Sequence, residues 1–246
     1  MGKVAIMGGT GLTSFDGLEL KSSFPVSTPF GEPSSDLVMG EYKGKQVVFL
    51  HRHGEKHTIP PHRINYRANI WALKEMGVDR VIAIAAVGGI SKDMAPGVLS
   101  VPDQIIDYSH AREQSFFSDD FSVTKHIDFS YPYTEPLRQS IIEAAQQCHF
   151  DIVKHATYGV TQGPRLETAA EIKRLAQDGC SIVGMTAMPE AVLARELGLD
   201  YASCAVSVNW AAGLSGDVIS MTDIEDTLAK SQLKIRQIVT QLIEQL

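Results

Sequence analysis

The sequence predicts a single-domain α/β fold in which a mixed central β-sheet is flanked by helices. Short apolar runs rich in β-branched residues alternate along the chain with longer segments of helical character. No repeat, low-complexity tract or linker divides the 246 residues, so we expect one domain over residues 1–246. A hydrophobic fraction of 44% with 21% charged residues is enough for a sizeable core and excludes a disordered chain.

The N-terminal half predicts several strands around one helix. The expected strands are short apolar runs at residues 3–7, 37–39, 46–50, 81–86 and 105–106. A glycine-rich turn at 8–11 follows the first, and the second and third form a hairpin around 43–44. The helix covers residues 65–76, because Gly77 stands where a left-handed C-terminal cap is usual.

Residues 110–136 are irregular and crowded with Ser, Tyr, Phe and Asp. A segment of this length is long for a structureless loop inside a compact domain. We therefore expect it to be a functional excursion.

The C-terminal half alternates regularly. Strands are expected at 157–161, 181–185 and 201–208, and helices at 135–148, 167–177, 189–197 and 222–246. Pro189 stands in the first turn of its helix, where a missing N–H costs nothing. The last helix is amphipathic, since one stripe carries its apolar residues Ile224, Leu228, Ile235, Val239, Leu242 and Leu246.

Charge and composition exclude several classes of protein. The 22 basic and 29 acidic residues give a net charge of −7, which argues against binding to duplex nucleic acid. The longest apolar run, 81–87, is far shorter than the roughly 20 residues of a membrane span, and the N-terminus has no signal-peptide pattern. The 3 cysteines (Cys148, Cys180 and Cys204) are far apart and fit a reducing compartment, so we expect a cytoplasmic protein.

Two strand ends in the first part of the chain could bind an anion. In the turn 8–11, glycines let backbone N–H groups approach a ligand and Thr10 adds a hydroxyl, although such a turn often only reverses the chain. Arg52 follows a buried strand, so it needs either an internal carboxylate or a bound anion. The flanking His51, His53 and His57 also allow a metal site, which we regard as the lesser alternative because no further ligand set is evident.

Two later strand ends have the same character. Small residues at 85–89 allow close approach of a ligand or tight packing under a helix. Met185 and Thr186 precede a helix, where Thr186 could bind an anion or simply cap the helix. Together, Thr10, Arg52, Thr186 and backbone amides predict a site for a phosphate-sized anion.

The chain resembles the trimeric purine nucleoside phosphorylase and methylthioadenosine phosphorylase family over nearly its whole length. The block at 52–77 is the most specific and is more similar to the methylthio-nucleoside branch. The motifs that carry the resemblance are GGTG (8–11), TPFGEPS (28–34), RHGEKHTIPPHRINYRANIWALKEMG (52–77), AAVGGI (85–90), TQGPRLET (161–168), GMTAMPEAVLARELG (184–198) and YASCAVSVNWAAG (201–213).

The resemblance implies phosphorolysis, in which a nucleoside and phosphate give a free purine and a sugar 1-phosphate. It places phosphate on Gly8, Thr10, Arg52, His53, Ala86 and Thr186. Asn209, Thr186 and His53 carry the catalysis, Met185 lines the ribose, and Glu167, Trp210 and Ala211 meet the base with Asn209. Phosphate is a co-substrate, and neither a cofactor nor a metal is expected. The family also implies a homotrimer in which His126 reaches a neighbour's sugar pocket. Ala85 stands where the methylthioadenosine branch has threonine, so one phosphate contact differs.

Asn209 and Glu167 indicate a 6-oxopurine base. The adenine-specific branch has aspartate in place of Asn209, whereas an amide can donate to N7 or O6 of an oxopurine. Glu167 stands where the oxopurine branch has a glutamate that accepts from N1–H. The alternative for Glu167 alone is an acidic residue in the first turn of a helix.

Met221 aligns with a histidine that binds the 5′-hydroxyl in general phosphorylases. Methionine cannot donate a hydrogen bond but packs well against a methylthio group, although ordinary core packing is the alternative. The combination predicts a nucleoside with an oxopurine base and a methylthio tail. The rivals within the family act on inosine and guanosine or on methylthioadenosine; those outside it are a metal-dependent hydrolase and a catalytically inactive nucleoside-binding protein.

Overall fold

The computed structural model describes residues 2–9, 17–118 and 122–246, and it is centred on parallel strands. Strand β1 (Lys3–Gly8) lies between β4 (Lys45–His51) and β5 (Val78–Gly89), and β11 (Asp200–Trp210) pairs with β5; all these pairs are parallel. Their burial is nearly continuous, as expected for strands covered on both faces.

Antiparallel pairs make the sheet mixed. On one side, β2 (Leu18–Phe24) and β3 (Leu37–Tyr42) extend the sheet from β4 as an antiparallel meander. On the other, β10 (Ile182–Gly184) runs antiparallel to the end of β5 and continues through β9 (Thr157–Val160) to β7 (Gln104–Asp107). Short β6 (Leu99–Ser100) joins β11 to β8 (Ile152–Val153).

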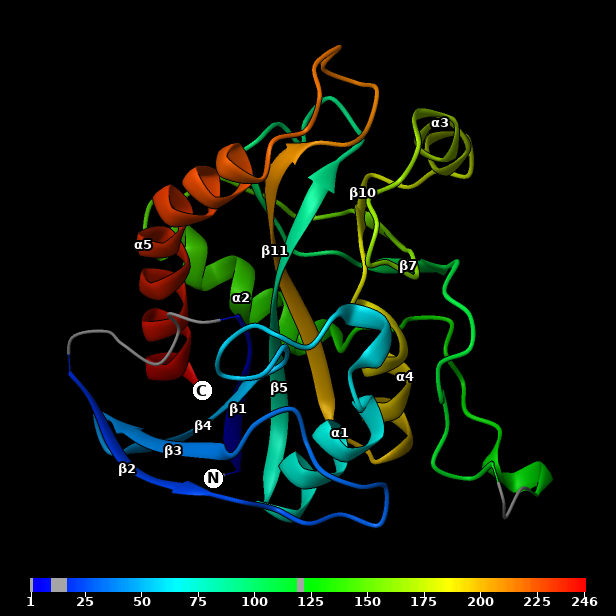
Figure 1. Cartoon of the computed structure of the whole chain (residues 1–246). Helices are drawn as coiled ribbons and strands as arrows, with labels where there is room; N and C mark the ends of the chain where they lie inside the picture. Colours follow the sequence, from blue (N-terminus) through cyan, green and yellow to red (C-terminus); the bar gives the residue numbers. More distant parts are fainter. Residues whose placement is uncertain (1, 10–16, 119–121) are drawn as a thin grey trace.

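Helices cover both faces of the sheet (Figure 1). Helices α1 (Tyr66–Glu75) and α4 (Ala187–Glu196) pack on one face through Ile70, Leu73 and Leu193. Helices α2 (Glu135–Gln147) and α5 (Met221–Gln245) pack on the other through Ile141, Val239 and Leu242. Helix α3 (Ala169–Gln177) covers the far end near β10. This arrangement confirms the predicted α/β class with a mixed sheet.

The elements expected from sequence are present, with a few differences in extent. Strand β5 is longer than the predicted 81–86, because its ends are held by β1 and β10. Helix α3 begins at Ala169 rather than at residue 167, because the Thr168 side chain caps it and Glu171 completes a capping box. Strand β2 was not predicted, because its side chains are almost all exposed and give no apolar pattern.

The segment between β7 and α2 is the irregular excursion that the sequence predicted. Within its described part, the helical structure is limited to a single turn, η2 (Val123–Lys125), which lies at the tip of a projection in Figure 1. The base of the excursion is tied to the body by Arg112, whose guanidinium donates to the Met185 carbonyl at 2.7 Å. Among the described helices, none is long and apolar enough to cross a membrane.

Candidate active site

A cavity of about 500 Å³ opens at the carboxyl ends of the central strands, where α/β sheets usually bind ligands. It is bounded by the ends of β4, β5, β10 and β11 and by the first turns of α5. The predicted site residues in its lining are Arg52, His53, Ala86, Glu167, Met185, Thr186, Asn209, Ala211 and Met221. Residues as far apart in the sequence as Arg52 and Met221 are therefore brought to one site.

Arg52 is the charged centre of the cavity floor and is only 2% exposed. Its Nε and Nη2 form an ion pair with the fully buried Glu190, the Nη2–Oε2 distance being 3.0 Å. Its Nη1 donates to the Ile84 carbonyl at 2.9 Å. The Tyr201 hydroxyl donates to Glu190 at 2.9 Å. The internal carboxylate that the sequence allowed as a partner of Arg52 is therefore Glu190. Burial opposes the charge, but Glu190 more than compensates and raises the pKa of Arg52.

His53 lies beside Arg52 and is held as a neutral ring. Its Nδ1 is 2.9 Å from the Ile59 carbonyl, so Nδ1 carries the proton and donates to it. Burial, followed by the positive charge of Arg52, lowers the pKa of His53 to about 4. At neutral pH its Nε2 is therefore a hydrogen-bond acceptor, available to a protonated ligand oxygen.

Thr186 and Ala86 supply the rest of the predicted phosphate wall. Thr186 is the N-cap residue of α4, but its side chain makes no capping hydrogen bond, so simple helix capping does not explain the hydroxyl. Ala86 is exposed within an otherwise buried stretch of β5, on the side that faces the cavity. Tight packing, the other explanation for the small residues at 85–89, applies at Gly89, where an added Cβ would lie 1.8 Å from the Met94 carbonyl oxygen.

Asn209 reaches the cavity through an irregularity in β11. The register against β5 shifts between Ser207 and Asn209, and a bulge of this kind re-aims the side chains beside it. The Asn209 Nδ2 donates one hydrogen bond, at 2.7 Å, to the Trp210 carbonyl. An amide has two N–H donors and one acceptor oxygen, so the group retains capacity for a ligand.

Glu167 lies outside helix α3, before its Thr168 cap. The alternative that explained Glu167 as an acid in the first helical turn is therefore wrong. Its Oε1 accepts a hydrogen bond from the Thr161 hydroxyl at 2.6 Å, and the residue lines the cavity.

Met221 is the first residue of α5 and is 62% exposed at the cavity. Core packing, the alternative explanation for this residue, is incompatible with that exposure. Apolar residues of the same helix, Ile224 and Leu228, continue the cavity wall beyond Met221.

Some predicted residues lie outside the cavity lining. Gly8 ends β1, and its carbonyl accepts from the Arg52 N–H at 3.1 Å, so it supports the site through the backbone. Trp210 contributes its carbonyl to Asn209 but does not line the cavity. His126 follows the projecting turn η2 and does not line the cavity of its own chain. Thr10 lies outside the described residues.

Three residues of the site were not singled out from the sequence. Glu190 is the ion-pair partner of Arg52, Tyr201 donates a hydrogen bond to Glu190, and Thr161 donates one to Glu167. The signal for Glu190 was an acid within the apolar first part of its helix, where an unpaired carboxylate is costly. Nothing local in the sequence distinguishes Tyr201 or Thr161.

The histidines that allowed a metal site in the sequence do not have the arrangement of metal ligands. The rings of His53 and His57 lie against each other at an interplanar angle of 31°, with centroids 4.5 Å apart, and Nδ1 of His53 donates to a carbonyl. In the part of the chain that the structure describes, no three His, Cys, Asp or Glu residues form a group able to hold a metal ion.

Comparison with known proteins relates this site to a family. The sequence profile of the Phosphorylase superfamily matches residues 3–244. The chain belongs to this superfamily. A probable S-methyl-5′-thioinosine phosphorylase of Pseudomonas syringae is 50% identical over 97% of each chain. A 6-oxopurine nucleoside phosphorylase of Pyrococcus furiosus is 41% identical, over 97% of this chain and 91% of the relative.

Solved structures of the superfamily have the same fold. A methylthioadenosine phosphorylase from an antarctic soil metagenomic library superimposes with a TM-score of 0.92 at 35% identity, covering 98% of this chain and 85% of that one. The methylthioadenosine phosphorylase of Schistosoma mansoni, in complex with tubercidin, gives a TM-score of 0.91 at 32% identity, covering 99% and 91%.

Proposed function

We propose that this protein catalyses the phosphorolysis of S-methyl-5′-thioinosine to hypoxanthine and 5-methylthioribose 1-phosphate. The observation that carries the proposal is the meeting of Asn209, Glu167 and Met221 around one cavity that also contains Arg52 and Thr186. The first two suit an oxopurine and the third a methylthio group. The 50% identical relative with a matching name supports the same substrate.

The reaction chemistry fits these residues. Cleavage of an N-glycosidic bond builds positive charge on the sugar and negative charge on the departing purine. A phosphate held below the ring stabilises the cation and then attacks it, and Asn209 donates toward N7 of the leaving base. No side chain is needed as a nucleophile, and we propose that phosphate is a co-substrate and that no cofactor takes part.

The buried ion pair determines how much positive charge the cavity floor offers to phosphate. The positive charge of Arg52 is already balanced by Glu190, and His53 is neutral at pH 7. The floor of the cavity therefore carries little net charge of its own. A phosphate bound there keeps the negative charge that stabilises a cationic sugar.

The main rival is a general 6-oxopurine nucleoside phosphorylase, which is the name of the Pyrococcus furiosus relative. Methylthioadenosine phosphorylase, the name of the structural neighbours, comes next. The decisive experiment is a panel of inosine, guanosine, adenosine and their 5′-methylthio analogues, each with and without phosphate. Faster turnover of methylthioinosine than of inosine and methylthioadenosine supports the proposal. Faster turnover of inosine would favour the general 6-oxopurine nucleoside phosphorylase, and faster turnover of methylthioadenosine would favour methylthioadenosine phosphorylase.

Base release is expected to require phosphate and to survive treatment with a chelator. The reason is that Thr186 lines the cavity beside the buried Arg52, where phosphate is proposed to bind, and the chemistry needs no Lewis acid. The measurement is hypoxanthine release by chelator-treated enzyme in buffers with and without phosphate. Equal turnover without phosphate would contradict phosphorolysis, and inactivation by chelator would favour the metal-dependent hydrolase.

Thr186→Val is a more suitable variant than a substitution of Arg52 for locating the phosphate. Removing Arg52 would leave the buried Glu190 without its charged partner and destabilise the fold, whereas the Thr186 side chain makes no capping hydrogen bond. We expect the KM for phosphate to rise by roughly tenfold to a hundredfold, the effect of losing a hydrogen bond to a charged group. An unchanged KM for phosphate would place the anion elsewhere.

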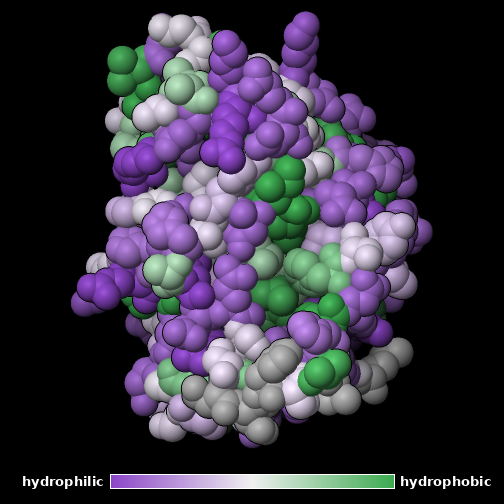
Figure 2. Space-filling view, turned by 90° about the vertical axis from the view of Figure 1, so that its right-hand side faces the viewer, coloured by the Kyte–Doolittle hydropathy of each residue, from purple (hydrophilic) through white to green (hydrophobic). Residues whose placement is uncertain are grey.

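We also propose a cytoplasmic homotrimer with active sites near subunit interfaces. The excursion exposes apolar side chains, with Val123 at 81% and Tyr131 at 73% exposure. The face that carries this segment shows a run of hydrophobic surface in a hollow between hydrophilic rims (Figure 2). A surface of this kind suits a second copy of the chain better than solvent.

Sedimentation of the purified protein is expected to give a trimer at assay concentrations. His126→Ala is expected to lower activity without changing the cavity of its own subunit. A stable and fully active monomer would contradict the trimer.

A further inference from the structure

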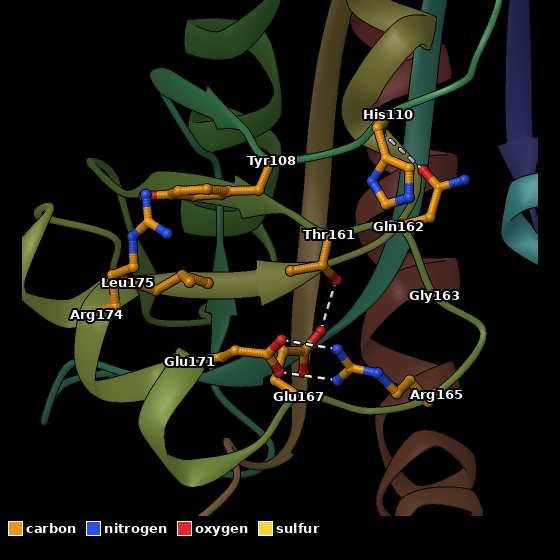
Figure 3. Close-up of a pocket in the computed structure, with 10 residues that line it drawn as sticks. All are labelled: Tyr108, His110, Thr161, Gln162, Gly163, Arg165, Glu167, Glu171, Arg174 and Leu175. Carbon is orange, nitrogen blue, oxygen red and sulfur yellow. Dashed lines mark hydrogen bonds and ion pairs between the residues drawn. The ribbon is translucent and has the colours of Figure 1, made fainter.

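Glu167 lies in the wall between two cavities. It lines the proposed base site and also a second cavity of about 470 Å³, formed with Tyr108, Gln162, Arg165, Glu171 and Arg174 (Figure 3). A flexible carboxylate in this position could turn to either side. To accept a hydrogen bond from N1–H of a base, the Glu167 carboxylate must stay turned toward the base.

The cation that could draw Glu167 away is already paired. Arg165 forms two hydrogen bonds with Glu171, at 2.8 and 2.7 Å. Glu171 is fixed in turn by the Thr168 N–H at 2.7 Å, as part of the capping box of α3. Figure 3 shows this pair as a fork beside Glu167. Arg165 is therefore not the group that orients Glu167.

Thr161 is that group. Its hydroxyl oxygen lies 2.6 Å from Oε1 of Glu167 and 3.3 Å from the Gly184 carbonyl. The single hydroxyl proton goes to the carboxylate, because that contact is shorter and the acceptor is charged. Across the described ranges 2–9, 17–118 and 122–246, this is the only hydrogen bond of the Glu167 carboxylate.

The backbone of Thr161 is itself fixed on both sides. Its N–H donates to the Gly184 carbonyl at 2.8 Å. Its carbonyl accepts from Nη2 of Arg112 at 3.1 Å, and the same guanidinium donates to the Met185 carbonyl on the opposite wall. The hydroxyl is thus held in place by contacts with β10 and with the base of the excursion.

We propose that Thr161 is a specificity-determining positioning residue, whose hydroxyl holds one oxygen of Glu167 so that the other accepts N1–H of a 6-oxopurine. This inference rests on the proposed function, since it assumes that Glu167 contacts the base. Adenine has an acceptor at N1 and gains nothing from an oriented carboxylate. The loss of Thr161 therefore affects oxopurine substrates far more than aminopurine substrates.

The test is Thr161→Val, which replaces the hydroxyl by a methyl group of similar size. We expect kcat/KM for methylthioinosine to fall about tenfold to a hundredfold, the usual effect of losing a charge-assisted hydrogen bond. For methylthioadenosine the value should change less than threefold, and the KM for phosphate should stay constant. The preference for the oxopurine should shrink accordingly.

Three further variants serve as controls. Thr161→Ser keeps the hydroxyl and is expected to restore most of the oxopurine activity. Thr157→Val makes the same chemical change at the other end of β9, away from the cavity, and is expected to act like wild type. Glu167→Gln shows directly whether the carboxylate accepts a hydrogen bond from the base.

The outcomes separate this inference from the proposed function. If wild type does not release hypoxanthine with phosphate, the proposed function fails first. If Glu167→Gln lowers oxopurine preference but Thr161→Val does not, the positioning role of Thr161 is wrong. Equal loss on both substrates that Ser does not rescue, or a fall in melting temperature that accounts for the loss, would mean that Thr161 is only structural. If Thr161→Val does not fold, Thr161→Ala and Thr161→Ser give the same comparison.

Discussion

Exchanging the base-reading pair by Asn209→Asp with Glu167→Ser is expected to reverse the preference of the enzyme from methylthioinosine to methylthioadenosine. The carboxylate introduced by Asn209→Asp would accept from the exocyclic amine of adenine, and Glu167→Ser would remove the carboxylate that otherwise faces adenine N1 unpaired. In the wild-type site, adenine would leave Asn209 and Glu167 without suitable partners. A buried polar site that loses its partners discriminates by about 10⁴-fold or more. The measurement is kcat/KM for both nucleosides with saturating phosphate.

The single variants divide this effect between the two positions. Neither side chain carries the fold, because within the described part of the chain the Asn209 side chain bonds only the neighbouring carbonyl and the Glu167 carboxylate only a hydroxyl. Each single variant is therefore expected to keep its melting temperature and its KM for phosphate. If wild type already cleaves methylthioadenosine as well as methylthioinosine, the assignment of Asn209 and Glu167 to the base is wrong.

The fold could be read from the sequence where local signals and burial agree. Strand β5 and helix α5 carry long apolar patterns, and Asn65 and Gly77 bracket α1 as a cap and a left-handed terminus. Strand β2 could not be predicted, since an exposed edge strand is specified by pairing with β3 and not by an apolar pattern.

The site could be predicted as a set of strand ends but not as a set of contacts. Arg52 required a partner, and the sequence could not choose between an anion and a carboxylate, because Glu190 lies 138 positions away. The bulge that re-aims Asn209 depends on the register of β11 against β5, which is a tertiary property. The role of Thr161 depends on a turn that brings it back to Glu167.

Met221 is expected to set the preference for a methylthio tail over a 5′-hydroxyl. Burying the extra methyl contributes roughly 0.8 kcal/mol. Leaving a hydroxyl without a partner costs about 1–3 kcal/mol. Together these values predict that methylthioinosine is preferred over inosine by roughly 20- to 600-fold in kcat/KM. Because Met221 is 62% exposed in the single chain, the lower part of this range applies unless a neighbouring subunit covers the mouth of the cavity.

Met221→His is expected to narrow this ratio, because imidazole donates to the 5′-hydroxyl and packs less well against the methylthio group. The measurement is competition between methylthioinosine and inosine at low concentration. Met221→Leu keeps an apolar side chain without a donor and is expected to retain the wild-type preference. Val218→His introduces the same imidazole at a nearby, 94% exposed position outside the cavity and should change nothing. A ratio that stays at the wild-type value in Met221→His would show that the tail is read elsewhere, with Ile224 and Leu228 in the same wall as the next residues to change.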